Sequence, residues 1–195
     1  ERRAPRDAAE HPMAWREVGR EQAPVQSVVH RNVDVRTLLP IPRHNEHDSA
    51  PYITAGLVIA RNPATGAQNV SINRIQVRDG DRAAILMLPR HLDAFFQAAA
   101  ARGEALPIAI VIGVDPLTLL ASQAIAAIDS DELEIAGALH GAPLPVVKCL
   151  TNEVRVPATA EIVIEGRVMP DEREIEGPFG EFPKYYSPQA MREVI

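Results

Sequence analysis

The sequence predicts an α+β fold built mostly from antiparallel strands, as a barrel or sheet decorated by helices. Short strand-like runs outnumber helical ones, and they come in hairpins rather than in strict strand-helix alternation. The length of 195 residues, with 46% hydrophobic and 24% charged side chains, suits one buried core. A doubly wound parallel sheet is therefore the less favoured fold.

The first clear strands read as a hairpin. The run PYITAGLVIA at 51–60 is rich in Ile, Val and Thr, RNPATGAQN supplies a long turn, and VSINRIQV at 70–77 brings the chain back. RDGD at 78–81 predicts a second turn, which leads into the strand AAILMLP.

Three helices follow from capping signals. The first has Pro89 in its first turn and Gly103 where a C-terminal cap would sit. After the strand LPIAIVIGVD, Asp115 is suited to cap a second helix with Pro116 at its first position. DSDELEIAGAL adds a short helix, and PLPVVKCL, NEVRVPA and AEIVIEGRVM predict three more strands.

The predicted domain covers residues 25–188. Residues 1–24 are charged, contain prolines and show no clear period, so we interpret them as a linker or a remnant of a preceding domain. Residues 189–195 read as the start of a linker helix that leads to a further, C-terminal domain.

Composition argues against several classes of function. A net charge of -6 with scattered Lys and Arg makes nucleic acid and anionic membranes unlikely partners. No apolar run reaches the roughly 18 residues of a membrane span and no signal region is visible, so a cytoplasmic location is expected. The single cysteine, Cys149, lies in an apolar run and is expected to be a buried strand thiol.

Common catalytic motifs are missing from the chain. It contains no G-x-G-x-x-G, no Walker A loop, no G-x-S-x-G and no paired C-x-x-C. The sequence therefore argues against nucleotide hydrolysis, against hydrolysis by a nucleophilic serine and against a structural zinc site.

The stretch EGPFGEFPKYYS at 176–187 contains residues that a simple turn does not require. It combines two acids, Glu176 and Glu181, with four aromatic residues, Phe179, Phe182, Tyr185 and Tyr186, in a chain that is only 4% aromatic. A simple reversal needs glycine and proline but neither acids nor aromatics. Paired acids near an arginine suit proton transfer, because their environments push the two carboxyl pKa values apart. A plain surface loop is the alternative.

Arg74 is the arginine that could serve these acids. It lies within an apolar run and, if it points inward, it needs a carboxylate partner such as Glu176 or Glu181, since an unpaired buried charge costs several kcal/mol. An exposed strand arginine is the alternative. Positions 69 and 74 differ by an odd number, so both serve one pocket only if a bulge intervenes or Asn69 lies on the turn.

Three further polar residues have ordinary structural explanations when taken singly. Asn69 could be a turn residue, His91 a helix-terminal residue and Glu132 an acid in the first turn of a helix. Arg90 and His91 together stand at a helix N-terminus, which suits an anion such as phosphate.

Long stretches of the chain resemble a known family. LLPIPRHNEHDSAPYITAGLVIARNPATGAQNVSINRIQV, GALHGAPLPVVKCLTNEVRVPATAEIVIEGRV and above all EGPFGEFPKYYS are similar to the UbiD family of reversible (de)carboxylases, in order from about Val25 to Ser187. The family uses prenylated FMN, and the resemblance implies a split β-barrel of flavin-reductase type. Family members also carry an α/β domain before the barrel and a further domain after it that holds the dimer contacts.

The resemblance implies a function and a set of partners. The function is reversible, non-oxidative decarboxylation of an α,β-unsaturated or (hetero)aromatic carboxylic acid. The partners are this small-molecule acid, a flavin prenyltransferase that supplies the cofactor, and further copies of the chain in a homo-oligomer. The alternative is an isolated cofactor-binding module that is not catalytic by itself.

The resemblance also assigns residues. Asn69, His91 and Glu132 would bind Mn²⁺ or Mg²⁺ together with the cofactor phosphate, with K⁺ as a possible second ion, and oxygen donors with one imidazole suit such hard cations. The surroundings of Ser71, Ile72, Arg74 and Arg90 would contact the flavin.

The catalytic assignments follow from the same resemblance. Glu181 would protonate the substrate carbon, Arg74 would orient the substrate carboxylate, and Glu176 would support the arginine. The loop aromatics would wall the pocket. Pro183 and Lys184 depart from the family pattern, which often has a small residue or Gly before the two tyrosines.

Overall fold

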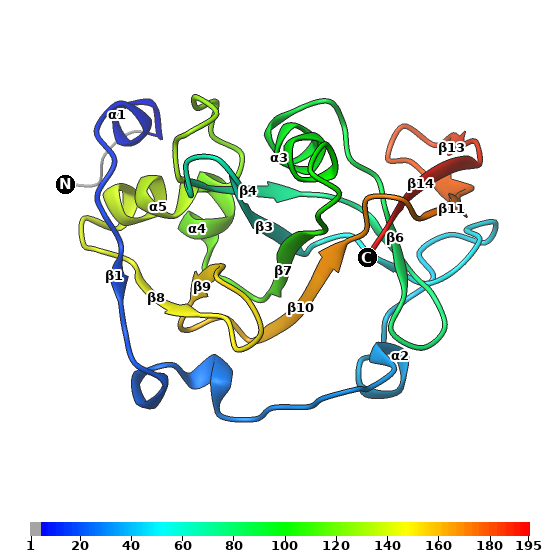
Figure 1. Cartoon of the computed structure of the whole chain (residues 1–195), viewed down its shortest axis with the longest axis horizontal. Helices are drawn as coiled ribbons and strands as arrows, with labels where there is room; N and C mark the ends of the chain where they lie inside the picture. Colours follow the sequence, from blue (N-terminus) through cyan, green and yellow to red (C-terminus); the bar gives the residue numbers. More distant parts are fainter. Residues whose placement is uncertain (1–4) are drawn as a thin grey trace.

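The central sheet of the molecule has four antiparallel strands. In the computed structural model, which describes residues 5–195, their order is β10 (Ile162–Val168), β7 (Leu106–Ile112), β3 (Leu57–Arg61) and β4 (Gln68–Ile72) (Figure 1). Each pairing in it is antiparallel. The α+β, mostly antiparallel prediction is confirmed.

A second sheet carries the C-terminal part of the chain. Its order is β11 (Arg173–Glu176), β14 (Ala190–Val194), β6 (Ala83–Ile85), β5 (Ile75–Val77) and β2 (Tyr52–Ile53). Beside it, β12 (Phe179–Gly180) and β13 (Tyr186–Ser187) form a small hairpin. The described strands thus form open sheets, and the split β-barrel stays a prediction.

The helix expected over 189–195 is wrong, because β14 is a strand. It pairs with β11 from Ala190 to Glu193 and with β6 at Glu193 and Val194, and Val194 is buried. Those partners are far away in the sequence, and their ladder outweighs the weak local preference for a helix.

The predicted hairpin is present, but both of its strands change sheets midway. The chain leaves β2 and begins β3 after Gly56, and it leaves β4 and begins β5 after Asn73 and Arg74. β3 pairs with β4 in the central sheet, whereas β2 pairs with β5 in the second sheet. A side chain at Gly56 would come within 2.9 Å of Ile110, so the backbone needs glycine for this close approach.

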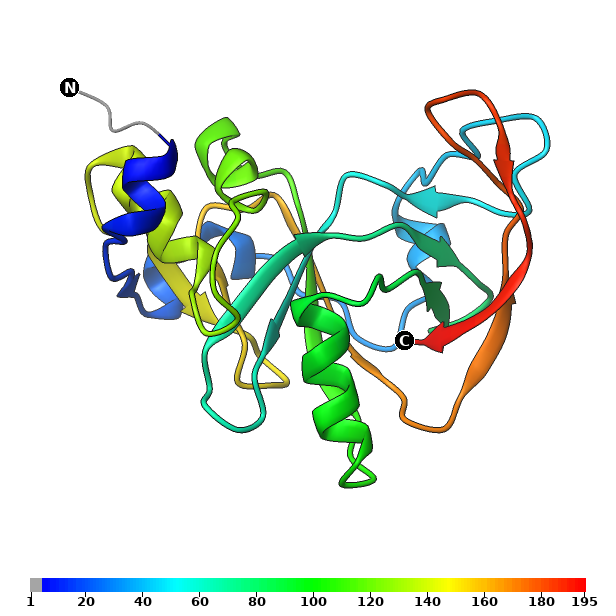
Figure 2. The same ribbon diagram turned by 90° about the horizontal axis from the view of Figure 1, so that it is seen from above.

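A third sheet and most helices lie at the other end of the molecule (Figures 1 and 2). Its strands are β1 (Arg16–Glu17), β8 (Pro145–Lys148) and β9 (Arg155–Pro157), and β1 pairs with β8 in parallel. The helical segments at this end are α1 (Pro5–Glu10), η1 (Arg20–Gln22), η2 (Pro24–Gln26), α4 (Pro116–Ala121) and α5 (Glu132–His140). Helix α2 (Val35–Leu38) lies instead beside the second sheet, where Arg36 pairs with Asp79. Of the predicted linker, residues 1–4 lie outside the described part, and Ala8, Val18 and Ala23 contribute to the core. The domain boundary at residue 25 stays a prediction.

Helix α3 (His91–Ala100) packs between the two ends of the molecule (Figure 2). Leu92, Phe95 and Phe96 bury its apolar face in the core shared with β3 and β7. Arg90 is the residue that precedes the helix as its N-cap, so Pro89 lies just before the first turn rather than in it. Gly103 has φ 69°, as its predicted capping role requires.

The other capping predictions hold. Asp115 Oδ1 accepts hydrogen bonds from the Leu117 and Thr118 amides at 2.9 and 3.1 Å, and Pro116 begins α4. Cys149 is buried directly after β8, and burial raises the pKa of its thiol. No helix within residues 5–195 is both long enough and apolar enough to cross a bilayer.

Candidate functional site

The side chain of Arg74 is held between two glutamates. Its Nε and Nη2 donate to the two carboxylate oxygens of Glu176 at 3.0 and 2.8 Å, and its Nη1 donates to Glu181 Oε1 at 2.5 Å. The exposed fractions of the side chains are 9% for Arg74, 0% for Glu176 and 28% for Glu181. The structure therefore brings the three predicted residues together in one buried cluster.

The break between β4 and β5 explains how the side chains of Asn69 and Arg74 can serve one pocket. Asn69 belongs to β4, which ends at Ile72, and Arg74 lies directly before β5, which begins at Ile75. Because the regular alternation of faces stops between the two strands, the odd spacing no longer separates the two side chains. The break therefore interrupts the alternation of side chains, as a bulge between the two residues or a turn at Asn69 was expected to do.

The loop that carries the acids is shaped by backbone geometry. Glu176 ends β11, and Gly177 follows with φ 93° and a cis peptide bond to Pro178. Beyond β12, the Glu181 amide donates to the Tyr185 carbonyl at 2.8 Å, and the Lys184 amide donates to the Glu181 carbonyl at 2.9 Å. Lys184 has φ 69°, in the left-handed region that favours glycine.

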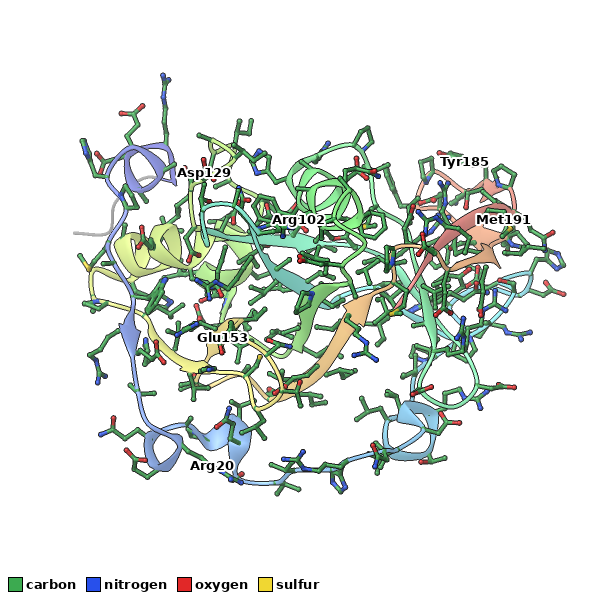
Figure 3. The ribbon with its side chains drawn as sticks, viewed as in Figure 1. Arg20, Arg102, Asp129, Glu153, Tyr185 and Met191 are labelled. Carbon is green, nitrogen blue, oxygen red and sulfur yellow. The ribbon has the colours of Figure 1, made fainter. Side chains whose placement is uncertain are left out.

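Among the four loop aromatics, Phe179 packs on the cluster. The Arg74 guanidinium carbon lies 5.0 Å from the centre of its ring, and the Tyr52 ring centre lies 4.6 Å away. Phe182 is 96% exposed, and Tyr185 and Tyr186 are exposed too. Figure 3 shows Tyr185 at the outer end of the molecule. Phe179 is therefore the loop aromatic that packs on the cluster, and the expectation that all four wall a pocket stays a prediction.

Two residues of this cluster were missed by the sequence analysis. Ser187 Oγ accepts a hydrogen bond from Arg74 Nη1 at 2.9 Å and donates to the Phe179 carbonyl at 3.2 Å. Tyr52 is fully buried, and burial raises the pKa of its hydroxyl to about 12, an effect opposed by a hydrogen bond to Ser49 and increased by the charge of Glu176. Ser187 ends the motif itself, which was the available signal.

Strand β4 presents a row of polar side chains. Asn69 and Ser71 alternate on the strand, so they share one face, and Asn73 follows directly after the strand ends. Asn69 Nδ2 donates to Ser71 Oγ at 3.3 Å, and Ser71 Oγ donates to Asn73 Oδ1 at 2.9 Å. Within the part of the chain that the structure describes, the Asn69 oxygen Oδ1 accepts no hydrogen bond and is available to a ligand.

Glu132 reaches the same strand from the first turn of α5. Its Oε2 accepts the Val70 amide at 2.7 Å, next to Asn69, and the residue is 3% exposed. Burial raises the pKa of its carboxyl to about 7, although the bond from Val70 opposes this. Asp131 caps the helix and accepts a hydrogen bond from Trp15 Nε1 at 3.0 Å, which fixes where α5 begins.

The remaining predicted residues lie near the start of α3 or at the end of β4. Arg90 is exposed, His91 is half-buried as the first residue of α3, and Ile72 is exposed at the end of β4. Across residues 5–195, no group of three or more His, Cys, Asp and Glu side chains is placed to hold a metal ion. The structure thus joins Glu132 to the backbone amide that follows Asn69, and within residues 5–195 it shows no hydrogen bond or ion pair between His91 and either residue.

The pair of Asn69 and Glu132 fits a hard divalent cation in its chemistry. An amide oxygen and a carboxylate are the donors that Mn²⁺ and Mg²⁺ prefer. Glu132 is buried with a neutral backbone amide as its hydrogen-bond partner, and this burial raises the pKa of its carboxyl.

Comparison with known proteins gives a consistent picture. The model of the family described as "UbiD: 3-octaprenyl-4-hydroxybenzoate carboxy-lyase Rift-related domain" matches residues 16–195. An anhydromevalonate phosphate decarboxylase of Methanothermobacter thermautotrophicus is 50% identical over 141 residues, which are 72% of this chain and 33% of that protein. A phenolic acid decarboxylase of Bacillus subtilis is 36% identical over 86% of this chain and 37% of its own length.

A solved structure is also similar. The UbiD-class enzyme HmfF from Pelotomaculum thermopropionicum, in complex with FMN, superposes with a TM-score of 0.95 at 52% identity, over 97% of this chain and 43% of that one. An evolved dimeric form of the same enzyme was solved in complex with prFMN. The chain therefore spans less than half the length of these relatives.

Proposed function

This chain belongs to the UbiD family of carboxy-lyases, and from that premise we propose that it is the prenylated-FMN-binding part of a decarboxylase. The substrate would be an α,β-unsaturated or (hetero)aromatic carboxylic acid, and the reaction would be reversible. The observation that carries the proposal is the buried cluster of Arg74 with Glu176 and Glu181, because two acids that share one arginine suit proton transfer.

Glu181 is the proton donor in this proposal, and Glu176 is the fixed anchor. Glu176 is fully buried and occupies two N–H groups of Arg74, whereas Glu181 is the more exposed partner and occupies one. As a neutral acid, Glu181 gives its proton to the carbon from which CO₂ has departed and becomes a carboxylate. It regains a proton from solvent before the next turnover.

The hydrogen bonds of Arg74 determine how a substrate carboxylate could bind. A guanidinium has five N–H donors, and here Glu176 takes two of them, while Glu181 and Ser187 each take one. A protonated Glu181 competes weakly for Nη1, so that donor becomes available to the incoming carboxylate. The proton on Glu181 thus serves as the proton to be donated and also leaves Arg74 Nη1 available to the substrate carboxylate.

When bound, prenylated FMN supplies the electron sink that loss of CO₂ from an sp² carbon requires. Asn69 and Glu132, joined by His91, would hold Mn²⁺ or Mg²⁺ against the cofactor phosphate, and K⁺ would be a second ion. Ser71, Ile72 and Arg90 would contact the cofactor, in keeping with their positions on β4 and at the start of α3. A flavin prenyltransferase would supply the cofactor, and the protein would act as a homo-oligomer with its flavin seated on a split barrel.

The role of Glu181 is tested in the protein at its natural length, loaded with prenylated FMN and Mn²⁺. We expect Glu181→Gln to lower kcat by about 10²- to 10⁴-fold, the usual contribution of a general acid, on a panel of phenolic, furoic and acrylic acids. Glu174→Gln, on an acid two residues before Glu176 that pairs with exposed Arg82, is the matched control and should leave kcat unchanged. Normal turnover by Glu181→Gln would contradict the proposed acid.

A cofactor-binding module without activity of its own is the second candidate. It is favoured by the length of the chain, which covers 33% and 37% of the two decarboxylases compared above. Native mass spectrometry and absorbance of this chain, co-expressed with a flavin prenyltransferase in Mn²⁺, test it. Bound cofactor without turnover supports the module, whereas turnover by this chain alone supports the enzyme.

A further inference from the structure

The loop that carries Glu181 is fastened to a distant loop at residues 45–49. The Ser49 amide donates to the Pro178 carbonyl at 3.0 Å, and the His47 amide donates to the Tyr186 hydroxyl at 3.2 Å. Between these two contacts, the Gly180 amide donates to Asp48 Oδ1 at 2.7 Å. The two loops therefore meet along the outer edge of β12, opposite the edge that pairs with β13.

Asp48 is the buried centre of this contact. Asp48 is 2% exposed. Its second oxygen, Oδ2, accepts the Asn45 amide at 2.8 Å and the Asn45 side-chain amide at 3.4 Å. A buried carboxylate is costly unless its oxygens are satisfied, and here N–H groups from both loops satisfy them. Removing the carboxylate would leave those N–H groups without their acceptor.

Both backbone polar groups of Gly180 are hydrogen-bonded to the loop at residues 45–49. Its N–H is bound by Asp48, and its carbonyl oxygen accepts Asn45 Nδ2 at 3.3 Å. A side chain at Gly180 would come within 2.5 Å of that nitrogen, so glycine permits the close approach. Because Gly180 immediately precedes Glu181, this contact fixes the direction in which the Glu181 side chain leaves the backbone.

We propose that Asp48 is a positioning residue, which holds the Gly180 peptide so that the Glu181 carboxyl faces Arg74 and the reacting carbon. Asp48 touches neither Arg74 nor the polar face of β4, so its effect passes through the loop. The proposal rests on the proton-donor role of Glu181 proposed above.

The test compares variants in the protein at its natural length, loaded with prenylated FMN and Mn²⁺. We expect Asp48→Ala to lower kcat by about 10- to 100-fold, because a misplacement of about 1 Å has effects of that order, with KM and cofactor absorbance close to wild type. Asp48→Asn keeps an oxygen for the Gly180 amide and should restore most of kcat. Hydrogen exchange of the peptide 177–187, followed by mass spectrometry, should accelerate in Asp48→Ala.

Glu165→Ala is the matched control. Glu165 also fastens a loop through its carboxylate, which accepts the Leu150 and Thr151 amides at 2.8 and 2.7 Å, but it lies on β10 outside the proposed site. We expect this variant to lose stability while kcat and exchange in 177–187 stay at wild-type values. A loss of kcat equal to that of Asp48→Ala would overturn the positioning role, since general destabilisation would explain both.

Glu181→Gln, measured beside these variants, separates the two proposals. An inactive Glu181→Gln with Asp48→Ala at wild-type kcat would overturn the role of Asp48 and leave the proposed function intact. Loss of cofactor from Asp48→Ala would also overturn it, because Asp48 would then support binding. A fully active Glu181→Gln would overturn the proposed function, and the role of Asp48 with it.

Discussion

Two arginines that directly precede strands of the second sheet each pair with two glutamates, but at different depths. Arg74 binds Glu176 and Glu181 at 2.8 and 2.5 Å, and Arg82 binds Glu174 and Glu172 at 2.9 and 2.5 Å. Glu174 and Glu176 are two residues apart on β11, so they share a face of that strand. The Arg82 side chain is 43% exposed, whereas that of Arg74 is 9% exposed.

The difference teaches that burial, and not the types of residue, separates the candidate site from a surface ion pair. Exposed pairs contribute about 0–1 kcal/mol each. Buried pairs stabilise no better than hydrophobic residues of the same volume, because desolvation offsets their attraction. A buried Glu-Arg-Glu cluster is therefore a poor choice for stability alone, which supports a chemical role for it.

The largest expected effect comes from breaking the two clusters at their arginines. Arg74→Ala leaves the fully buried Glu176 without its cation, and we expect the free energy of unfolding to fall by about 3–5 kcal/mol. Arg82→Ala removes solvent-exposed pairs and should cost less than about 1 kcal/mol. Urea unfolding of both variants measures the contrast, and equal losses would contradict the distinction by depth.

A second prediction concerns Glu132, a buried carboxylate that accepts a hydrogen bond from the Val70 amide rather than from a cation. Burial raises its pKa from 4.5 to about 7, so the folded protein keeps this proton at pH values where the unfolded chain has lost it. Its contribution to stability is therefore full below pH 4.5 and is lost as the pH rises through about 7.

Urea unfolding in chelator, at a series of pH values, checks this second prediction. Between pH 4 and pH 8, wild type should lose about 3 kcal/mol more than Glu132→Gln, which has no proton to release. Added Mn²⁺ should reduce the difference, because a coordinated carboxylate stays ionised. Parallel pH profiles of the two proteins would contradict the raised pKa.

The glutamates of β11 give a finer comparison. Glu176→Gln keeps the shape of the side chain but removes a charge that accepts two hydrogen bonds from Arg74, so we expect a loss of about 1.5–3 kcal/mol in unfolding free energy. Glu174→Gln should change it by less than about 1 kcal/mol. Thermal unfolding of the two variants at equal concentration provides the measurement.

The smallest expected effect lies at the outer turn of the loop. Lys184 adopts φ 69°, which costs a residue with a side chain about 1 kcal/mol that glycine avoids. Lys184→Gly should therefore raise the free energy of unfolding by up to about 1 kcal/mol, reduced by the greater freedom of glycine in the unfolded chain. A marked loss of stability in the same unfolding assay would show that the lysine side chain itself supports the turn.

The sequence by itself determined the features that depend on near neighbours. Asp115 with Pro116 begins α4 as predicted, because an N-cap and its amides lie within three residues of one another. The hairpin-rich antiparallel fold also followed from local alternation and turn residues. The family motif pointed to Arg74, Glu176 and Glu181. The expectation that Arg74 pairs with one of these acids came from the need of a buried charge for a partner.

Only the tertiary structure decided the features that depend on distant partners. The ladder with β11 and β6 made 190–194 a strand, and the break between β4 and β5 removed the difficulty posed by the odd spacing of Asn69 and Arg74. The contact of Asp48 with Gly180 has no local signal, because the two residues are 132 positions apart. Pairing, burial and close backbone approach are energies of the folded chain, and a stretch of sequence acquires them only when the rest of the molecule is in place.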